Sequence, residues 1–212
     1  MSALPATDDV YKVDFKELFH HLYATSERRV EVVNVPRMHF IVCPREGDKY
    51  SQESFRKTAR VLRRISLGVQ MDVRSANVME YTSMPLEVLW KTGGESAGYE
   101  FPPKSWMFMV MQPVVNRVRF EKERERMMMN EELPDCPLIE LKSFHEGLSV
   151  QILHQGPVRE EPRARERLTD FIMSQGYQAR GEPHTIYLYD PGEADENALR
   201  AIIRQPVATV AP

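Results

Sequence analysis

The sequence predicts an α+β fold made of two strand–helix–strand–strand (βαββ) units related by a pseudo-twofold axis. Each half of the chain contains three segments rich in β-branched or alternating apolar residues and one helix with an apolar stripe. A chain of 212 residues can bury a large core without disulfides or metals. Two such units give a mostly antiparallel sheet with both helices on one face, and we expect a concave ligand cleft on the other face.

The first unit runs from about residue 30 to 112. Its first strand (30–43) is interrupted by Pro36, which lacks the N–H that a central strand needs and so marks a bulge, an edge or a corner. A helix capped by Ser51 follows to about Met71, with an apolar face formed by Phe55, Ala59, Leu62, Ser66 and Val69. Strands at 86–91 and 106–112 complete the unit, separated by a stretch rich in glycine and proline.

The second unit runs from about residue 138 to 207, after a connecting helix at about 114–130. We expect His145-Glu146-Gly147 to form a hairpin turn into a strand at 149–155. A helix after Pro162 ends near Gly176, and strands at 183–190 and near the C-terminus follow. With residues 1–10 as a loose tail, we treat residues 1–212 as a single domain.

Composition excludes several function classes. The net charge of −3 and the lack of a strongly basic segment argue against a nucleic-acid partner. Two cysteines do not make a disulfide framework, and neither a signal peptide nor a membrane-spanning run is visible, so we expect a cytoplasmic protein. The six histidines show no metal-binding spacing and there is no phosphate loop or dinucleotide fingerprint, so we expect no metal and no cofactor.

The strand at 183–190 presents two different faces. His184, Ile186 and Leu188 suit packing against a helix, whereas Thr185, Tyr187 and Tyr189 suit an aromatic-lined cavity. In the other half, Trp90, Trp106 and Met109 offer a large contact area for a flat apolar ligand. The alternative is that all these side chains are ordinary core residues.

Glu87 is the candidate catalytic residue, because it is the only carboxylate in the strand that also carries Trp90. A carboxylate among aromatic rings can act as a base or pair with a cation. An exposed glutamate at a strand edge is the alternative.

Several ordered segments, from the N-terminal region to the last strand, match one known family. They are Tyr11–Lys16, Val33–Met38, Pro85–Trp90, Met111–Pro113, Val150–Pro157, Ile186–Leu188 with Asp190, and Arg204–Val207. With these segments the chain resembles the GyrI-like small-molecule-binding proteins, which are related to effector-binding domains of multidrug-sensing transcription regulators. The resemblance implies two βαββ repeats with a ligand cleft between them, in which Trp90, Trp106 and Tyr187 match cleft aromatics and Glu87 matches a glutamate of the motif.

The family includes hydrolases of cyclopropane-bearing genotoxins, drug-binding proteins and proteins described as gyrase inhibitors. Its last repeat usually reads His-Glu-Ile-Tyr, with the glutamate in the pocket, but this chain has Thr185 at that position. Lys91 replaces a second tryptophan, and Arg63 and Leu67 replace tyrosines of the first long helix. A threonine cannot carry charge or accept a proton near neutral pH, so the base of the hydrolases is missing.

These observations favour a protein that binds hydrophobic, planar aromatic small molecules without catalysis or with weak catalysis. The expected ligand-binding residues are Trp90, Trp106, Met109, Thr185 and Tyr187. The first alternative is a hydrolase that opens strained electrophilic rings, and the second is a gyrase-inhibitor-like protein-interaction module.

Overall fold

The computed structural model describes residues 10–46, 51–91, 105–133, 138–189 and 197–209. The predicted tail, apart from Val10, and most of the glycine-rich stretch before Trp106 lie outside the described residues. The elements are β1 (Lys12–Val13), α1 (Phe15–Leu18), α2 (His20–Tyr23), β2 (Glu31–Glu46), α3 (Gln52–Ser75), β3 (Glu80–Tyr81), β4 (Leu86–Lys91), β5 (Ser105–Met111), α4 (Arg117–Met129), β6 (Glu140–Gly156), a 3₁₀ turn (Val158–Glu160), α5 (Glu161–Ser174), β7 (Tyr177–Ala179), β8 (His184–Tyr187) and β9 (Leu199–Thr209).

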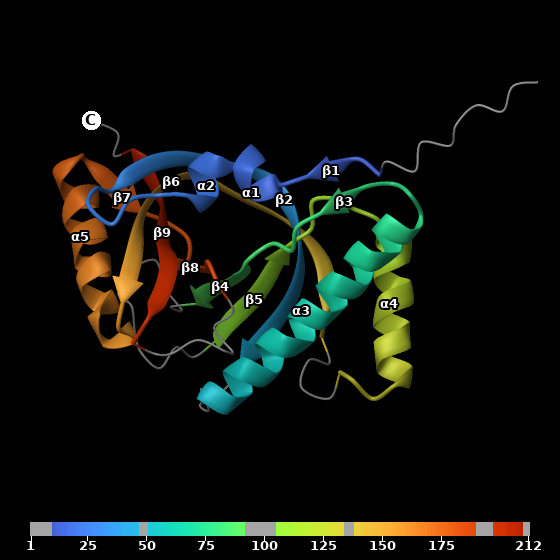
Figure 1. The fold of residues 1–212 in the computed structure, drawn as a ribbon. Helices are drawn as coiled ribbons and strands as arrows, with labels where there is room; N and C mark the ends of the chain where they lie inside the picture. The colour runs from blue at the N-terminus through green and yellow to red at the C-terminus, as the bar shows by residue number, and fades with distance from the viewer. Residues whose placement is uncertain (1–9, 47–50, 92–104, 134–137, 190–196, 210–212) are drawn as a thin grey trace, which may run out of the picture.

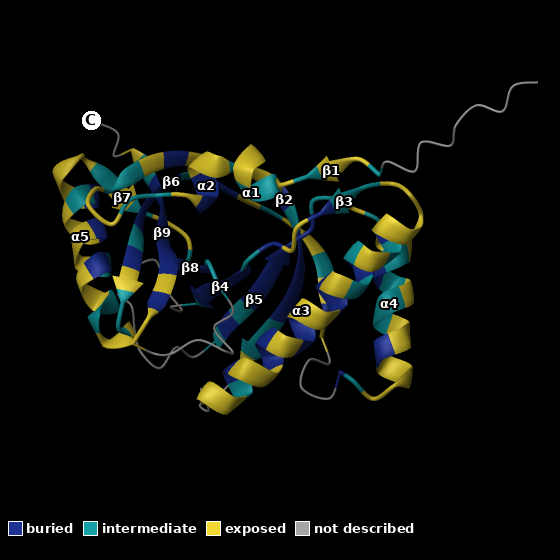
Figure 2. Cartoon of the chain, viewed as in Figure 1, coloured by how far each residue is buried: buried dark blue, intermediate teal, exposed yellow. Residues whose placement is uncertain are grey.

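The predicted α+β class with a large antiparallel sheet is confirmed. Seven strands pair in the order β6-β2-β5-β4-β8-β9-β7, and β6 also pairs with β9. Six of these strands, all except β7, therefore form a closed ring in which every neighbouring pair is antiparallel. Closure turns one face of the ring inward. Strands β4 and β8 are buried on both faces (Figure 2).

The ring bends where β2 and β6 cross. Their pairing runs from Glu31 opposite Gln151 to Val42 opposite Glu140, but it skips Pro36 and Glu146. Pro36 has no N–H to donate at this point, as the sequence indicated, and the neighbouring Gly147 has a φ of 74°. The predicted hairpin at residues 145–147 is wrong, because these residues form a kink inside one long strand, β6.

The helices lie at opposite ends of the sheet, with α5 at one end and α3 and α4 at the other (Figure 1). The Ser51 hydroxyl caps α3 by accepting a hydrogen bond from the Ser54 N–H at 3.1 Å. The predicted apolar face of α3 is buried, and the helix continues past its predicted end to Ser75. Asp72 joins α3 to α4, since it pairs with Lys122 at 2.8 Å and also with Arg119.

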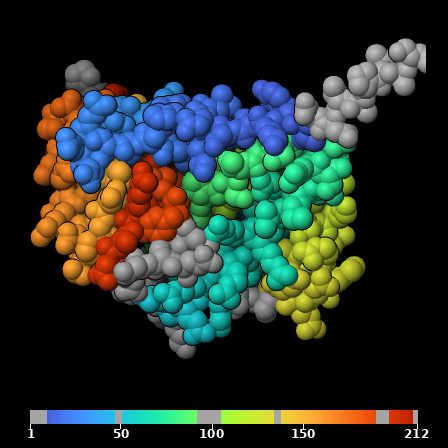
Figure 3. Space-filling model, in the orientation of Figure 1, coloured from blue at the N-terminus to red at the C-terminus, as the bar shows by residue number. Residues whose placement is uncertain are grey.

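The N-terminal segment crosses the edge of the molecule between the two helical ends (Figure 3). This segment forms two short helices, which meet at Phe19. Asp14 caps the first of them by accepting a hydrogen bond from the Lys16 N–H at 2.9 Å. Leu22 and Tyr23 of α2 are buried in the core, so this segment is anchored and does not merely lie on the surface. No helix in the described ranges is long and apolar enough to cross a membrane.

Candidate functional site

Four of the five predicted ligand-binding residues lie on one face of the sheet. Trp90 of β4 stands directly opposite Trp106 of β5. On β8, Thr185 pairs with Val88 and Tyr187 pairs with Leu86, which alternate with the same face as Trp90. Residues directly opposite in neighbouring strands point the same way, so the structure brings these side chains onto a shared surface.

This surface is the one that both helices cover. The Phe55 ring of α3 lies 4.9 Å from Phe108 and 5.7 Å from Tyr187, measured between ring centroids. From α5, the Arg165 side chain reaches Thr185. The predicted arrangement, with helices on one face and the aromatic cleft on the other, is therefore wrong for these residues.

The predicted facing of β8 is wrong for the same reason. His184 and Ile186 do not pack against a helix but point into the ring, where they are fully buried. Helices α3 and α5 pack on the outer face, and the short helix α2 reaches the inner face through Leu22 and Tyr23.

Hydrogen bonds join Trp90, Thr185 and Arg165 within the aromatic surface. The Trp90 indole N–H donates to the Thr185 hydroxyl at 2.9 Å, and the Arg165 guanidinium donates to the same oxygen at 3.2 Å. Arg165 also pairs with Glu161, one helical turn earlier, at 2.6 Å. Thr185 therefore does face Trp90, and Arg165 links its hydroxyl to the Glu161 carboxylate of α5.

Glu87 and Met109 lie on the opposite, inner face. They are direct cross-strand partners, and Glu87 also stands opposite Ile186. The Glu87 carboxylate accepts a hydrogen bond from the Tyr23 hydroxyl at 3.1 Å. Glu87 Oε2 also lies 3.0 Å from His184 Nε2, as an ion pair whose angle is poor for a hydrogen bond. The structure does not bring Glu87 or Met109 together with the tryptophans.

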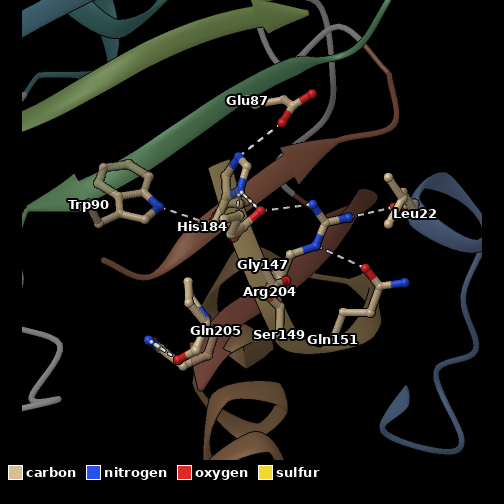
Figure 4. Close-up of polar contacts among 12 residues, drawn as sticks. Leu22, Glu87, Trp90, Gly147, Ser149, Gln151, His184, Arg204 and Gln205 are labelled. Carbon is tan, nitrogen blue, oxygen red and sulfur yellow. Dashed lines mark hydrogen bonds and ion pairs between the residues drawn. The ribbon is translucent and has the colours of Figure 1, made fainter. Parts of the chain in front are cut away.

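His184 and Arg204 connect Glu87 to the rest of the interior (Figure 4). His184 Nδ1 and Arg204 Nη1 each lie 3.1 Å from the Glu146 carboxylate. Arg204 also donates to the Gln151 side chain at 3.0 Å and to the Leu22 carbonyl at 2.7 Å. We call Tyr23, Glu87, His184, Glu146, Arg204 and Gln151 the inner network. The hydrogen bond from Arg204 to the Leu22 carbonyl connects α2 to the ring.

Burial and neighbouring charges shift the pKa of three residues of the inner network. Burial alone would lower the pKa of His184, but Glu146 and Glu87 outweigh it and raise the pKa to about 9. Burial likewise opposes ionisation of Glu146, yet His184 and Arg204 lower its pKa to about 2. Burial, and then the charge of Glu87, raises the pKa of Tyr23 well above its usual value. A protonated His184 cannot take up a proton, so His184 is poorly suited to act as a general base near pH 7.

Sequence reasoning missed Arg165, Glu161, Glu146 and Arg204. Arg204 had a usable signal, because an arginine within the mostly apolar stretch 201–207 needs a buried partner. Glu146 was hidden by its place in an apparent turn sequence. Arg165 and Glu161 have the spacing of an ordinary surface ion pair, and only the fold shows that they reach a strand. Among the described residues, no group of three or more His, Cys, Asp or Glu side chains is arranged to hold a metal ion.

Known proteins resemble this chain in structure more than in sequence, since no protein-family model and no curated protein matches it. An uncharacterized conserved protein from Listeria innocua is 26% identical, with a TM-score of 0.79 over 92% of this chain and 100% of that one. A hydrolase from Listeria innocua is 25% identical, with a TM-score of 0.77 over 93% and 100%. The C-terminal domain of EcmrR is 12% identical, with a TM-score of 0.53 over 86% and 98%, and shows the fold alone. These neighbours confirm the resemblance to the GyrI-like proteins.

Replacement of Arg204 by methionine is expected to destabilise the protein strongly. The variant leaves Glu146 buried with one cation fewer, and removing one partner of a buried ion pair costs about 3–5 kcal/mol. Arg200→Met is the matched control, because Arg200 lies on the same strand with an exposed side chain. Urea denaturation should show a large loss for Arg204→Met and less than about 1 kcal/mol for the control. Equal losses of stability in the two variants would contradict a large contribution of the inner network to stability.

Stability should fall on both sides of a plateau between about pH 4.5 and 6.5. The folded-state pKa of His184, about 9, exceeds its ordinary value of 6.5, so its contribution is full below pH 6.5 and is lost as the pH rises through 9. The folded-state pKa of Glu146 is below its ordinary value of 4.5, so its contribution is lost as the pH falls towards 2. Unfolding free energies measured from pH 3 to 10 test this, and His184→Gln should remove the alkaline decline. Stability that rises between pH 6.5 and 9 would refute the assignment.

Proposed function

We propose that this chain binds hydrophobic, planar aromatic small molecules on the outer face of the sheet, between α3 and α5. The observation that carries the proposal is the gathering of Trp90, Trp106, Thr185 and Tyr187 on one face, with Phe55 and Arg165 contributed by the two helices. Aromatic side chains around a few directed polar groups are typical of small-molecule sites. Met109 and Glu87 lie outside this proposed site.

The proposed site is closed in this structure. The side chains of Trp90, Trp106 and Thr185 are only 2–3% exposed, and that of Tyr187 is 9% exposed. A ligand can reach them only after covering atoms move aside. We therefore expect ligand association to be slower than it would be for an open, preformed site.

The proposed site would lie between two related βαββ units. The element order supports this, because β2-α3-β4-β5 and β6-α5-β8-β9 follow the same sequence apart from the short strands β3 and β7. The ring order supports it too, since exchanging β2, β5 and β4 for β6, β9 and β8 leaves the pairing unchanged. In this arrangement the junction of β4 and β8, where Trp90 meets Thr185, falls between the two units.

Hydrolysis of strained electrophilic rings is the second candidate, favoured by the 25% identity to a Listeria innocua hydrolase. The proposed site lacks a carboxylate at Thr185, and Glu87 points into the ring. The Glu161 carboxylate is held by Arg165. A positioned general base contributes about 10²- to 10⁴-fold, so we expect the chain to be a binder with weak turnover at most.

Ligand binding should quench tryptophan fluorescence, because both tryptophans of the chain belong to the proposed site. A panel of planar aromatic compounds titrated into the protein is expected to give saturable quenching for its tighter members. Calorimetry of the same compounds should show a negative heat-capacity change, which marks burial of apolar surface. N-acetyltryptophanamide controls for collisional quenching and light absorption by the ligand. Quenching that matches this control throughout the panel would refute the proposal.

A glutamate placed at position 185 should increase ring-opening activity. With a strained cyclopropyl electrophile, we expect wild-type protein to accelerate ring opening by less than about tenfold over buffer, and Thr185→Glu to be faster than wild type by up to about 10²-fold. Arg165 would keep the new carboxylate ionised, which is the form that accepts a proton. Product formation is followed by chromatography. Thr185→Gln has nearly the same size without charge and should stay slow; equal rates for the two variants would contradict the missing-base argument.

A further inference from the structure

The hydrogen-bond roles at Thr185 are unambiguous. Its hydroxyl oxygen lies 2.9 Å from Trp90 Nε1 and 3.2 Å from Arg165 Nη2. An indole N–H and a guanidinium can donate hydrogen bonds but have no lone pair with which to accept one. The Thr185 oxygen must therefore accept both hydrogen bonds.

Both lone pairs of the Thr185 hydroxyl are thereby engaged, while its proton remains to be donated. Among the described residues, none accepts a hydrogen bond from this hydroxyl. The residue is 2% exposed, so bulk water does not replace the missing acceptor. A buried hydroxyl proton without an acceptor carries a desolvation cost, which a suitable ligand atom would remove.

The groups around this hydroxyl are also donors. Trp90 and Arg165 approach it with N–H groups, and the Glu161 carboxylate of α5 is engaged by Arg165 at 2.6 Å. The ion pair between Arg165 and Glu161 adds no net charge. The polar centre of the site therefore offers hydrogen atoms and not lone pairs, in a setting that is close to neutral.

We propose that the aromatic ligand carries a hydrogen-bond acceptor, a carbonyl or carboxylate oxygen, that takes the Thr185 proton, and that the site discriminates against lipophilic cations. The proposal rests on the proposed function and deepens it by naming the ligand class. An ammonium group has no lone pair to offer Thr185 and would meet the Arg165 guanidinium. A neutral carbonyl is sufficient because Glu161 already compensates the charge of Arg165.

The test uses four ligands with the same ring system: 9-methylanthracene, anthracene-9-carboxamide, anthracene-9-carboxylate and 9-(aminomethyl)anthracene in its ammonium form. Dissociation constants are measured from anthracene fluorescence at pH 7. The carboxamide and the carboxylate are expected to bind about tenfold more tightly than 9-methylanthracene, the effect of one well-placed hydrogen bond in a buried site. The ammonium compound should bind more weakly than 9-methylanthracene.

Thr185 variants assign the effect to its hydroxyl. Thr185→Val keeps the shape of the side chain, and within this variant the carboxamide and the carboxylate should bind no more tightly than 9-methylanthracene. Thr185→Ser retains the hydroxyl and should keep the preference. Thr169→Val is the matched control, because Thr169 lies on α5 with an exposed side chain that bonds only to the Arg165 carbonyl.

The outcomes separate this proposal from the proposed function. If the four ligands bind equally, or if the ammonium compound binds most tightly, the acceptor proposal is overturned while small-molecule binding stands. A preference that survives in Thr185→Val would also overturn it. If none of the four binds, the proposed function itself is contradicted for flat aromatic ligands of this size, and the acceptor proposal falls with it.

Discussion

The closure of the sheet into a ring is the constraint on which the rest of the structure depends. Once β6 pairs with both β2 and β9, one face of six strands points inward, away from α3 and α5. Charged groups on that face must then be neutralised by one another. Glu146 and Arg204 do this across strands far apart in the sequence, and His184 extends the pairing to Glu87. The ion pairs and the topology therefore support each other.

Ring closure also holds the two strands that carry the proposed site. The inner network fixes β4 and β8 from within, and the same two strands carry Trp90 and Thr185 on their outer side. His184 and Thr185 are neighbours in sequence, so the residue that anchors the ring holds the residue at the centre of the proposed site. A rigid support of this kind keeps a small number of polar groups in a fixed direction, which selectivity requires.

Local sequence patterns were sufficient to predict most of the helices and strands, but not which face of a strand packs against the helices. The apolar stripe from Phe55 to Val69 predicted α3, and Pro36 correctly marked a corner in β2. Alternation along β8 separated its two faces, yet both faces are buried in a closed ring, so hydropathy could not show which one meets the helices. His145-Glu146-Gly147 looked like a turn because a kink with positive φ favours the same residues as a hairpin.

The candidate site shows the same limit of local reasoning. The tryptophans and Thr185 were named from their residue types, from the faces of their strands and from the resemblance, whereas Arg165 lies twenty residues away on a helix whose orientation depends on tertiary packing. Arg165 determines which hydrogen-bond role is left to the Thr185 hydroxyl. Without Arg165, the Thr185 hydroxyl could accept a hydrogen bond from a ligand as easily as it could donate one. With Arg165 and Trp90 on its lone pairs, it can only donate, so a ligand of the proposed site would have to accept a hydrogen bond at this position.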